Sequence, residues 1–266
     1  MNKNNLIKSL KKLGLRKGDK VLVNYEFFRI GKLEKIISND KYYETILSSI
    51  LKIVGNSGTI AVNSYSFFIA RNKKTSFNHF KTTSDSGGFS EFFRKKNGAI
   101  RSKHPIFSVS AIGKLKNKIC KNNSVTNYGY DSPYDKMLKN NFKILNFGTR
   151  PSWTPFLHVA ELTCGLPFFY NKIFKINYKY KRKITKKYFS AFVRFLNLDA
   201  EADLNFLDKK LNKLGFINEI KFGKGYIYLF NSNIYFKSLL KILTKYTFKI
   251  YSRALVNLNE KKYPMI

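Results

Sequence analysis

At 266 residues, with 44% hydrophobic and 16% aromatic residues, the chain can bury one large core, which excludes a disordered protein. Its formal net charge of +34 should attract anions and repel polycations. The lysines are spread along the whole chain, so we attribute most of this charge to composition rather than to one surface for nucleic acid or membrane. Two distant cysteines, no apolar run of membrane length and no signal core predict a cytoplasmic protein without a disulfide framework or metal cluster.

The first hundred residues alternate between helix and strand signals. Residues 6–13 predict a short amphipathic helix, and 20–24 form a short apolar run typical of a buried strand. Residues 42–54 carry apolar side chains at helical spacing, and 59–62 predict a second buried strand. A helix between two buried strands predicts an α/β fold built of packed layers.

The rest of the chain continues with short elements and shows no internal repeat and no low-complexity linker, so we expect a single domain. The predicted elements are a helix at 90–95, strands at 107–112 and 142–147, a helix at 203–214 and a strand at 226–230.

The C-terminal part, residues 237–266, differs from the main domain, residues 1–236, because it predicts a basic amphipathic helix. Its apolar stripe consists of Leu239, Leu243, Tyr246 and Ile250, and its basic stripe of Lys237, Lys241, Lys245 and Lys249. Such a helix could make a peripheral contact with an anionic membrane. The alternative, which we favour, is a helix that caps the domain and turns its lysines to solvent.

The most informative pair of residues is His158 and Glu161. The sequence contains only three histidines, and on a helix positions i and i+3 share one face. Glu161 could then hold one imidazole nitrogen while the other nitrogen faces a substrate, as in a general base and its orienting group. A surface ion pair is the alternative for this spacing taken alone.

Three further segments combine residue types that occur in ligand sites. Residues 82–88, Thr-Thr-Ser-Asp-Ser-Gly-Gly, precede a predicted helix, where backbone N–H groups can meet an anion or a carbonyl oxygen. In residues 101–105, His104 stands before a proline and is biased toward extended backbone. Residues 128–133 read as a turn that starts a helix. Each segment alone is also compatible with an ordinary loop.

In their order and separations these segments resemble the aminoglycoside 3-N-acetyltransferase family. The most specific parts are Ser-Lys-His-Pro at 102–105 and His-Val-Ala-Glu at 158–161. The resemblance covers roughly residues 6–230. The matching segments are 13–19, 54–59, 82–88, 100–105, 131–134 and 157–161, and the similarity is weaker at 206–207 and 222–224.

The resemblance implies a fold, a reaction and a set of site residues. The fold would be a three-layer α/β/α sandwich with a mixed central sheet, with residues 1–236 as the N-acetyltransferase domain. Acetyl-CoA would be the co-substrate, without a metal, and a homodimer is compatible with the resemblance. His158 would act as general base and Glu161 would orient it. The residues on the CoA side would be Thr82, Thr83, Ser84, Ser102 and His104.

One departure from the family concerns the acceptor. After the first strand the family commonly shows His-Ser-Ser, whereas this chain has Asn24-Tyr25-Glu26. The basic charge also disfavours a polycationic drug, so we expect an amine-bearing sugar that carries negative charge, such as a nucleotide-linked amino sugar of surface-polysaccharide synthesis. The alternative function is a basic, non-catalytic binding protein for nucleic acid or anionic membrane on the same scaffold; for the acetyltransferase we expect no nucleic-acid partner.

Overall fold

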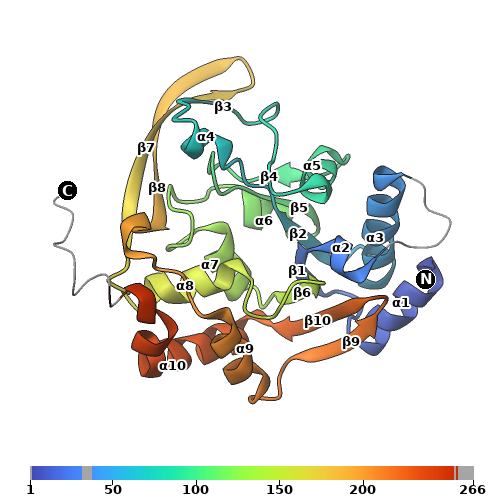
Figure 1. Ribbon diagram of the computed structural model, residues 1–266. Coiled ribbons are helices and arrows are strands. Elements are labelled where there is room, and N and C mark those ends of the chain that lie inside the picture. Colours follow the sequence, from blue (N-terminus) through green and yellow to red (C-terminus); the bar gives the residue numbers. More distant parts are fainter. Residues whose placement is uncertain (1, 32–37, 255, 257–266) are drawn as a thin grey trace.

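The computed structural model describes residues 2–31, 38–254 and 256 (Figure 1). Its centre is a seven-stranded mixed sheet with the strand order β4-β5-β2-β1-β6-β10-β9. Strand β1 pairs in parallel with β2 and β6, while β5 and β10 are antiparallel to these two neighbours. The strands are β1 Lys20–Tyr25, β2 Thr59–Asn63, β4 Ile100–Arg101, β5 Val109–Gly113, β6 Lys143–Phe147, β9 Asn218–Phe222 and β10 Gly225–Asn231.

Helices cover both faces of this sheet because its central strands are apolar on both sides. Successive side chains of a strand point to opposite faces, so Val21 and Val23 of β1 join one core cluster and Leu22 joins the other. The first face is covered by α1 Lys3–Lys12, α2 Phe27–Ile30, α3 Asn39–Val54 and α5 Gly88–Lys95. The second is covered by α6 Lys116–Cys120, α7 Pro133–Lys139, α8 Pro155–Thr163, α9 Leu204–Asn212 and α10 Ser232–Ile250.

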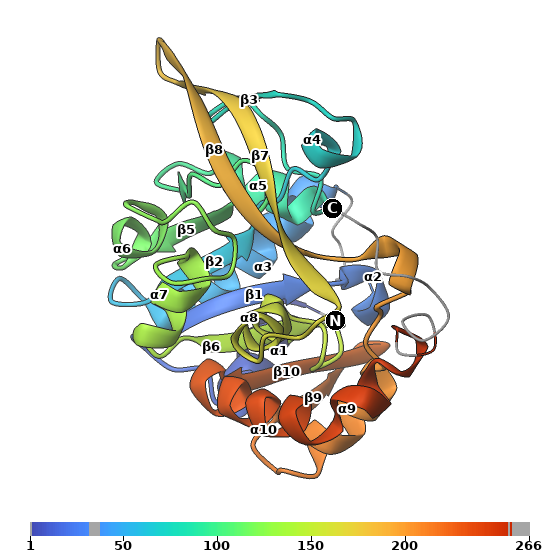
Figure 2. The same ribbon diagram turned by 90° about the vertical axis from the view of Figure 1, so that its left-hand side faces the viewer.

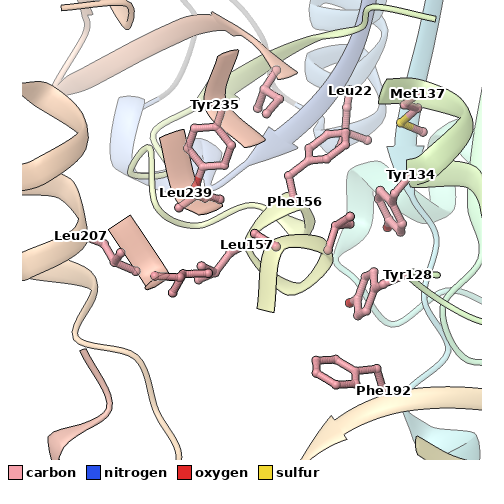
Figure 3. Packing of buried hydrophobic residues seen from close by; sticks show 14 of the residues in the cluster. Leu22, Tyr128, Tyr134, Met137, Phe156, Leu157, Phe192, Leu207, Tyr235 and Leu239 are labelled. Atoms are coloured by element: carbon pink, nitrogen blue, oxygen red, sulfur yellow. The ribbon is translucent and has the colours of Figure 1, made fainter. Parts of the chain in front are cut away.

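The second core cluster packs around α8, and Figure 3 shows Phe156 and Leu157 of this helix between side chains of the sheet and of α10. Phe156 and Leu239 of α10 are fully buried. The expected three-layer sandwich with a mixed sheet is therefore confirmed, and the α8 backbone is held firmly by its buried face.

A second, three-stranded sheet was not predicted from the sequence. It consists of β3 Ser76–Asn78, β7 Phe169–Tyr180 and β8 Lys183–Arg194, in the order β3-β7-β8. Figure 2 shows the β7–β8 hairpin standing out from the body, with the short helix α4 Phe68–Arg71 beside its far end. A small cluster around Phe77, Ile176 and Phe189 fixes it. Most other positions of the hairpin are exposed. Its sequence therefore lacks the regular alternation of apolar and polar residues that identifies a half-buried strand.

Helix α10 begins at Ser232, so the predicted boundary at residue 237 falls inside it. Its apolar stripe packs into the core with Leu239 and Leu243 fully buried, and each such side chain contributes about 1.5–3 kcal/mol through burial. The four lysines of its basic stripe are exposed to solvent. Of the helices within the described ranges, none combines the length and the apolar composition that a membrane crossing requires.

Candidate active site

His158 and Glu161 lie on α8, next to the carboxyl ends of the parallel strands. Pro155 occupies the first position of the helix, where its missing N–H is not needed, and Thr154 precedes it in an extended conformation. His158 Nδ1 lies 2.6 Å from Glu161 Oε2. The two side chains share one helix face, as their spacing predicts.

The hydrogen bonds of Glu161 determine which ring nitrogen of His158 carries the proton. Its second oxygen, Oε1, accepts a hydrogen bond from the hydroxyl of Tyr251. Because a carboxylate can only accept, the proton shared with Oε2 stands on His158 Nδ1. The lone pair of the neutral ring is therefore on Nε2, the nitrogen that is free to meet a proton donor.

A cavity of about 870 Å³ opens beside this pair. The His158 side chain is 46% exposed, whereas that of Glu161 is 2% exposed, so the ring faces the cavity and the carboxylate lies behind it. The walls come from the ends of β1 and β2, from residues 149–158, from β8 and from residues 200–204. The volume lies within the range of small-molecule sites.

The charge of the cavity wall is opposite to that of the whole chain. Among the described residues that line it, the charged ones are Glu26, Glu161, Glu201 and Arg194. Arg194 lies 2.8 Å from Glu201, and Glu26 is paired with an arginine outside the cavity at 2.7 Å. The wall therefore contains more carboxylates than guanidinium groups, with Glu26 and Glu201 both engaged in these ion pairs.

The environment makes His158 a stronger base than a free imidazole. Burial lowers its pKa, but the charge of Glu161 and its hydrogen bond raise it by more, and they also outweigh the positive charge of Arg194. The pKa of His158 therefore lies above its ordinary value of 6.5.

Buried tyrosines form the wall next to the imidazole. The ring of Tyr128 packs against that of His158 with centroids 5.3 Å apart. Behind it, the Tyr134 hydroxyl donates to Asn63 Oδ1 at 2.7 Å and is hydrogen-bonded to the hydroxyl of Tyr65. Burial raises the pKa of all three tyrosines well above the usual value, so this wall is neutral.

Three asparagines tie the carboxyl ends of the parallel strands together. Asn63 Nδ2 donates to Asn24 Oδ1 at 3.1 Å, and Asn24 Nδ2 donates to Asn146 Oδ1 at 2.9 Å. Asn146 Nδ2 then donates to the carbonyl of Arg150 at 3.0 Å, which anchors the segment leading to α8. The carboxyl edge of parallel strands is where α/β proteins bind ligands. Asn24, the first residue of the departure from His-Ser-Ser, thus has a structural role here.

Tyr25, the second residue of that departure, holds the glycine loop before α5. Its hydroxyl donates to the Ser86 carbonyl at 2.8 Å and accepts from the Ser90 N–H at 2.8 Å. Gly87 has φ 101°, and a Cβ there would lie 2.9 Å from the Tyr25 hydroxyl, so only glycine fits well. Ser86 and Ser90 consequently line the cavity.

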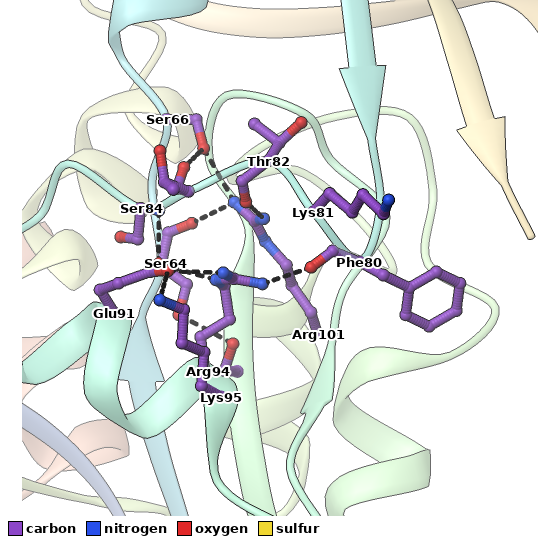
Figure 4. Close-up of polar contacts among 12 residues, drawn as sticks. Ser64, Ser66, Phe80, Lys81, Thr82, Ser84, Glu91, Arg94, Lys95 and Arg101 are labelled. Atoms are coloured by element: carbon purple, nitrogen blue, oxygen red, sulfur yellow. Dashed lines mark hydrogen bonds and ion pairs between the residues drawn. The ribbon is translucent and has the colours of Figure 1, made fainter.

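The loop of Thr82, Thr83 and Ser84 is built around the buried side chain of Arg101 (Figure 4). Arg101 donates to the Thr82 carbonyl at 2.5 Å and to the Ser64 carbonyl at 2.8 Å. The Ser84 N–H donates to a carboxylate on α5 at 2.8 Å, and the Thr83 carbonyl accepts from a serine hydroxyl at 2.6 Å. The loop is therefore anchored through its backbone, and the Thr83 side chain stays exposed.

Ser102 and His104 are buried, and their polar atoms are used within the protein. Ser102 Oγ accepts from the Val109 N–H at 2.8 Å. His104 Nδ1 accepts from two backbone N–H groups at 3.1 and 3.2 Å, so its Nε2 carries the proton and donates to the Ser190 carbonyl at 3.2 Å. Burial lowers the pKa of His104 to about 4, which keeps the ring neutral.

Of the seven residues selected from the sequence, the structure brings His158 and Glu161 to the cavity. The other five lie outside its lining: Thr82, Thr83 and Ser84 belong to the loop before α5, and Ser102 and His104 are buried. A contact between these five residues and CoA stays a prediction. In the described part of the chain, no three His, Cys, Asp or Glu side chains are grouped as a metal site.

Sequence reasoning missed Tyr251, Arg194 and the three hydrogen-bonded asparagines at the strand ends. Tyr251 is 90 positions from Glu161, and among 17 tyrosines no pattern distinguishes it. The asparagines carried a usable signal, because Asn24, Asn63 and Asn146 stand at the ends of buried apolar runs, where α/β proteins place ligand-site residues.

Comparison with solved structures shows the same fold. Aminoglycoside acetyltransferase AAC(3)-Xa superimposes with a TM-score of 0.79 at 18% identity, over 92% of this chain and 93% of that chain. AAC-IIIb, solved as a binary complex with CoASH, gives 0.77 at 19% identity, over 92% and 97%. The YokD protein from Bacillus subtilis gives 0.71 at 23% identity, over 92% and 99%.

Comparison with curated proteins finds no match. The family model described as aminoglycoside 3-N-acetyltransferase matches residues 26–244, which include α8 and most of the cavity wall. This chain therefore belongs to the aminoglycoside 3-N-acetyltransferase family, a family of acyltransferases that use acetyl-CoA as co-substrate.

Proposed function

We propose that the protein transfers the acetyl group of acetyl-CoA to the amine of an amino sugar, with His158 as general base and Glu161 as its orienting group. One observation carries the proposal: a buried carboxylate holds Nδ1 of an imidazole whose other side opens on a cavity of about 870 Å³. This arrangement leaves a basic nitrogen free on the side of the ring that a small molecule in the cavity can reach.

The chemistry requires one proton to move. The neutral amine attacks the thioester carbonyl carbon, a C–N bond forms, the C–S bond breaks and the thiolate of CoA leaves. His158 Nε2 takes the proton that the nitrogen must lose and passes it to the departing sulfur. Glu161 stabilises the imidazolium formed between these steps, and such general base catalysis contributes about 10²- to 10⁴-fold in rate.

The CoA side of the site is proposed on the loop before α5. The segment Thr82–Thr83–Ser84 lies at the surface, next to the cavity-lining Ser86. Ser102 and His104 would act beneath it by holding the loop in place. Exposed lysines near the loop, such as Lys81, suit the phosphates of CoA.

The finer proposal concerns the charge of the acceptor. The net charge of +34 favours an anionic molecule at long range, whereas the cavity wall, with three carboxylates and one guanidinium, favours an ammonium group at short range. A nucleotide-linked amino sugar satisfies both conditions if its phosphates stay at the lysine-rich surface. Equal turnover of kanamycin-type drugs and nucleotide-linked amino sugars would remove the basis of this finer proposal.

The test combines turnover with binding. Purified protein is incubated with acetyl-CoA and a panel of amino sugars, and acylated product is detected by mass. We expect product with the wild type and about 10²- to 10⁴-fold slower product formation with His158→Ala, while acetyl-CoA raises the stability of both proteins, by about 2.7 kcal/mol at 100 times its Kd. No product from any amine, no response to acetyl-CoA and steeply salt-dependent duplex binding would instead favour a basic binding protein.

A further inference from the structure

Tyr251 connects the C-terminal helix to the pair on α8. It follows directly on α10, is 1% exposed, and its ring contacts those of Phe168 and Phe169, with centroids 5.3 and 6.0 Å away. Its hydroxyl donates to Glu161 Oε1, whereas His158 Nδ1 meets Oε2. The three side chains form a continuous line from α10 to the cavity.

The hydroxyl matters because Glu161 is buried. Within the described part of the chain, the groups hydrogen-bonded to its carboxylate are His158 and Tyr251. A buried carboxylate that loses one of two donors becomes a stronger proton acceptor, since its charge is less well stabilised. The proton of the coupled pair is then held more tightly, whichever of the two groups carries it.

We propose that Tyr251 is a positioning residue: its hydroxyl fixes the Glu161 carboxylate and limits how tightly the His158–Glu161 pair holds a proton. This inference rests on the proposed role of His158 as general base. It also gives α10 a function beyond capping the domain, because α10 packs on α8 (Figure 2) and leads directly into Tyr251.

Other titratable groups face the pair from the surrounding elements. Tyr128 packs on the imidazole, Arg194 lies at the end of β8, and the remaining groups near Glu161 are Cys164 and Tyr235. The positive charge of Arg194 opposes protonation of His158. Replacing the Tyr251 hydroxyl leaves all these groups in place, so any change in the titration of His158 reports the lost hydrogen bond.

The variant is Tyr251→Phe, which keeps the aromatic ring and removes only the hydroxyl. The matched control is Tyr235→Phe, because Tyr235 lies on α10, the helix that leads into Tyr251, and its buried hydroxyl has no hydrogen-bond partner among the described residues. An NMR titration of the imidazole signals, recorded on the protein without ligand, gives the pKa of His158. The His158 signal is the one that is missing from the spectrum of His158→Ala. Burial lowers the pKa of His79 and His104 to about 4, which keeps their signals apart.

We expect the titration midpoint of His158 to rise by about one pH unit in Tyr251→Phe, the size expected when a charged group loses a hydrogen bond, and to stay unchanged in Tyr235→Phe. The kcat at pH 7 should fall about 10-fold, with an unchanged KM for acetyl-CoA, and most of the loss should disappear at alkaline pH. An unchanged or lowered midpoint in Tyr251→Phe, or an equal shift in the control, would overturn the proposal.

A second variant covers the case in which Tyr251→Phe does not fold. With 3,5-difluorotyrosine at position 251 the hydroxyl is kept and becomes a stronger donor, so the His158 midpoint should fall; a rise or no change contradicts the proposal. The titration needs no turnover. Failure of the wild type to acetylate any amine therefore refutes the proposed function, while the NMR result decides on Tyr251 separately.

Discussion

The substitution Glu161→Gln removes the charge of the orienting group and keeps its size. Glu161 accepts from both His158 and Tyr251, and an amide cannot accept with both of its ends. An amide NH₂ toward His158 forces the ring proton onto Nε2, the nitrogen that should receive the substrate proton. We expect kcat to fall by about 10²- to 10⁴-fold, the size of a lost general base.

The same substitution should change the pH profile in a defined direction. Two effects of Glu161, its charge and its hydrogen bond, raise the pKa of His158, whereas burial and Arg194 lower it. Without the charge the lowering effects dominate, and the acid limb of the rate profile should move from above 6.5 to below it. The profile is measured by release of the CoA thiol between pH 5 and 9, with acetyl-CoA binding followed by thermal shift.

The matched control is Glu44→Gln, which removes a surface carboxylate paired with Lys96 at 2.5 Å and should leave kcat unchanged. If Glu161→Gln kept a kcat within about twofold of the wild type and an unshifted acid limb, the reasoning from the His158–Glu161 hydrogen bond would be refuted.

Three further predictions follow from the site and the core. For the wild type, kcat/KM should fall as the pH drops through the pKa of His158, with a midpoint above 6.5, because protonation removes the base; a midpoint below 6.5 would contradict the effect of Glu161. Asn63→Leu removes the acceptor of the Tyr134 hydroxyl and the donor to Asn24 Oδ1, and should cost about 1–3 kcal/mol in urea unfolding; an unchanged midpoint would show that these two hydrogen bonds contribute nothing. Leu239→Ala empties a fully buried position and should cost about 2–5 kcal/mol, while Lys241→Ala on the exposed face of α10 should change stability by less than about 0.5 kcal/mol.

Local patterns in the sequence were sufficient for much of the fold. The apolar runs at 20–24 and 59–62 and the helical period at 42–54 lie in β1, β2 and α3. The contact between His158 and Glu161 was predictable for the same reason, because one helical turn determines it.

Contacts between distant segments could not be predicted in this way. The β7–β8 hairpin carries lysines at many exposed positions, so its alternation is hidden, and its pairing follows from tertiary contacts. Tyr251 reaches Glu161 only because α10 packs against α8. His104 looked available for a ligand in the sequence, but three backbone groups of the folded protein occupy its ring nitrogens.

Chemical rescue of His158→Ala tests whether the imidazole of His158 is the general base. The His158 side chain opens on the cavity, so its removal leaves space beside Glu161 that free imidazole can reach. We expect His158→Ala to bind acetyl-CoA but to acetylate an amino sugar about 10²- to 10⁴-fold more slowly, and we expect added imidazole to restore part of the rate. A wild-type rate in His158→Ala without imidazole would contradict this role of His158.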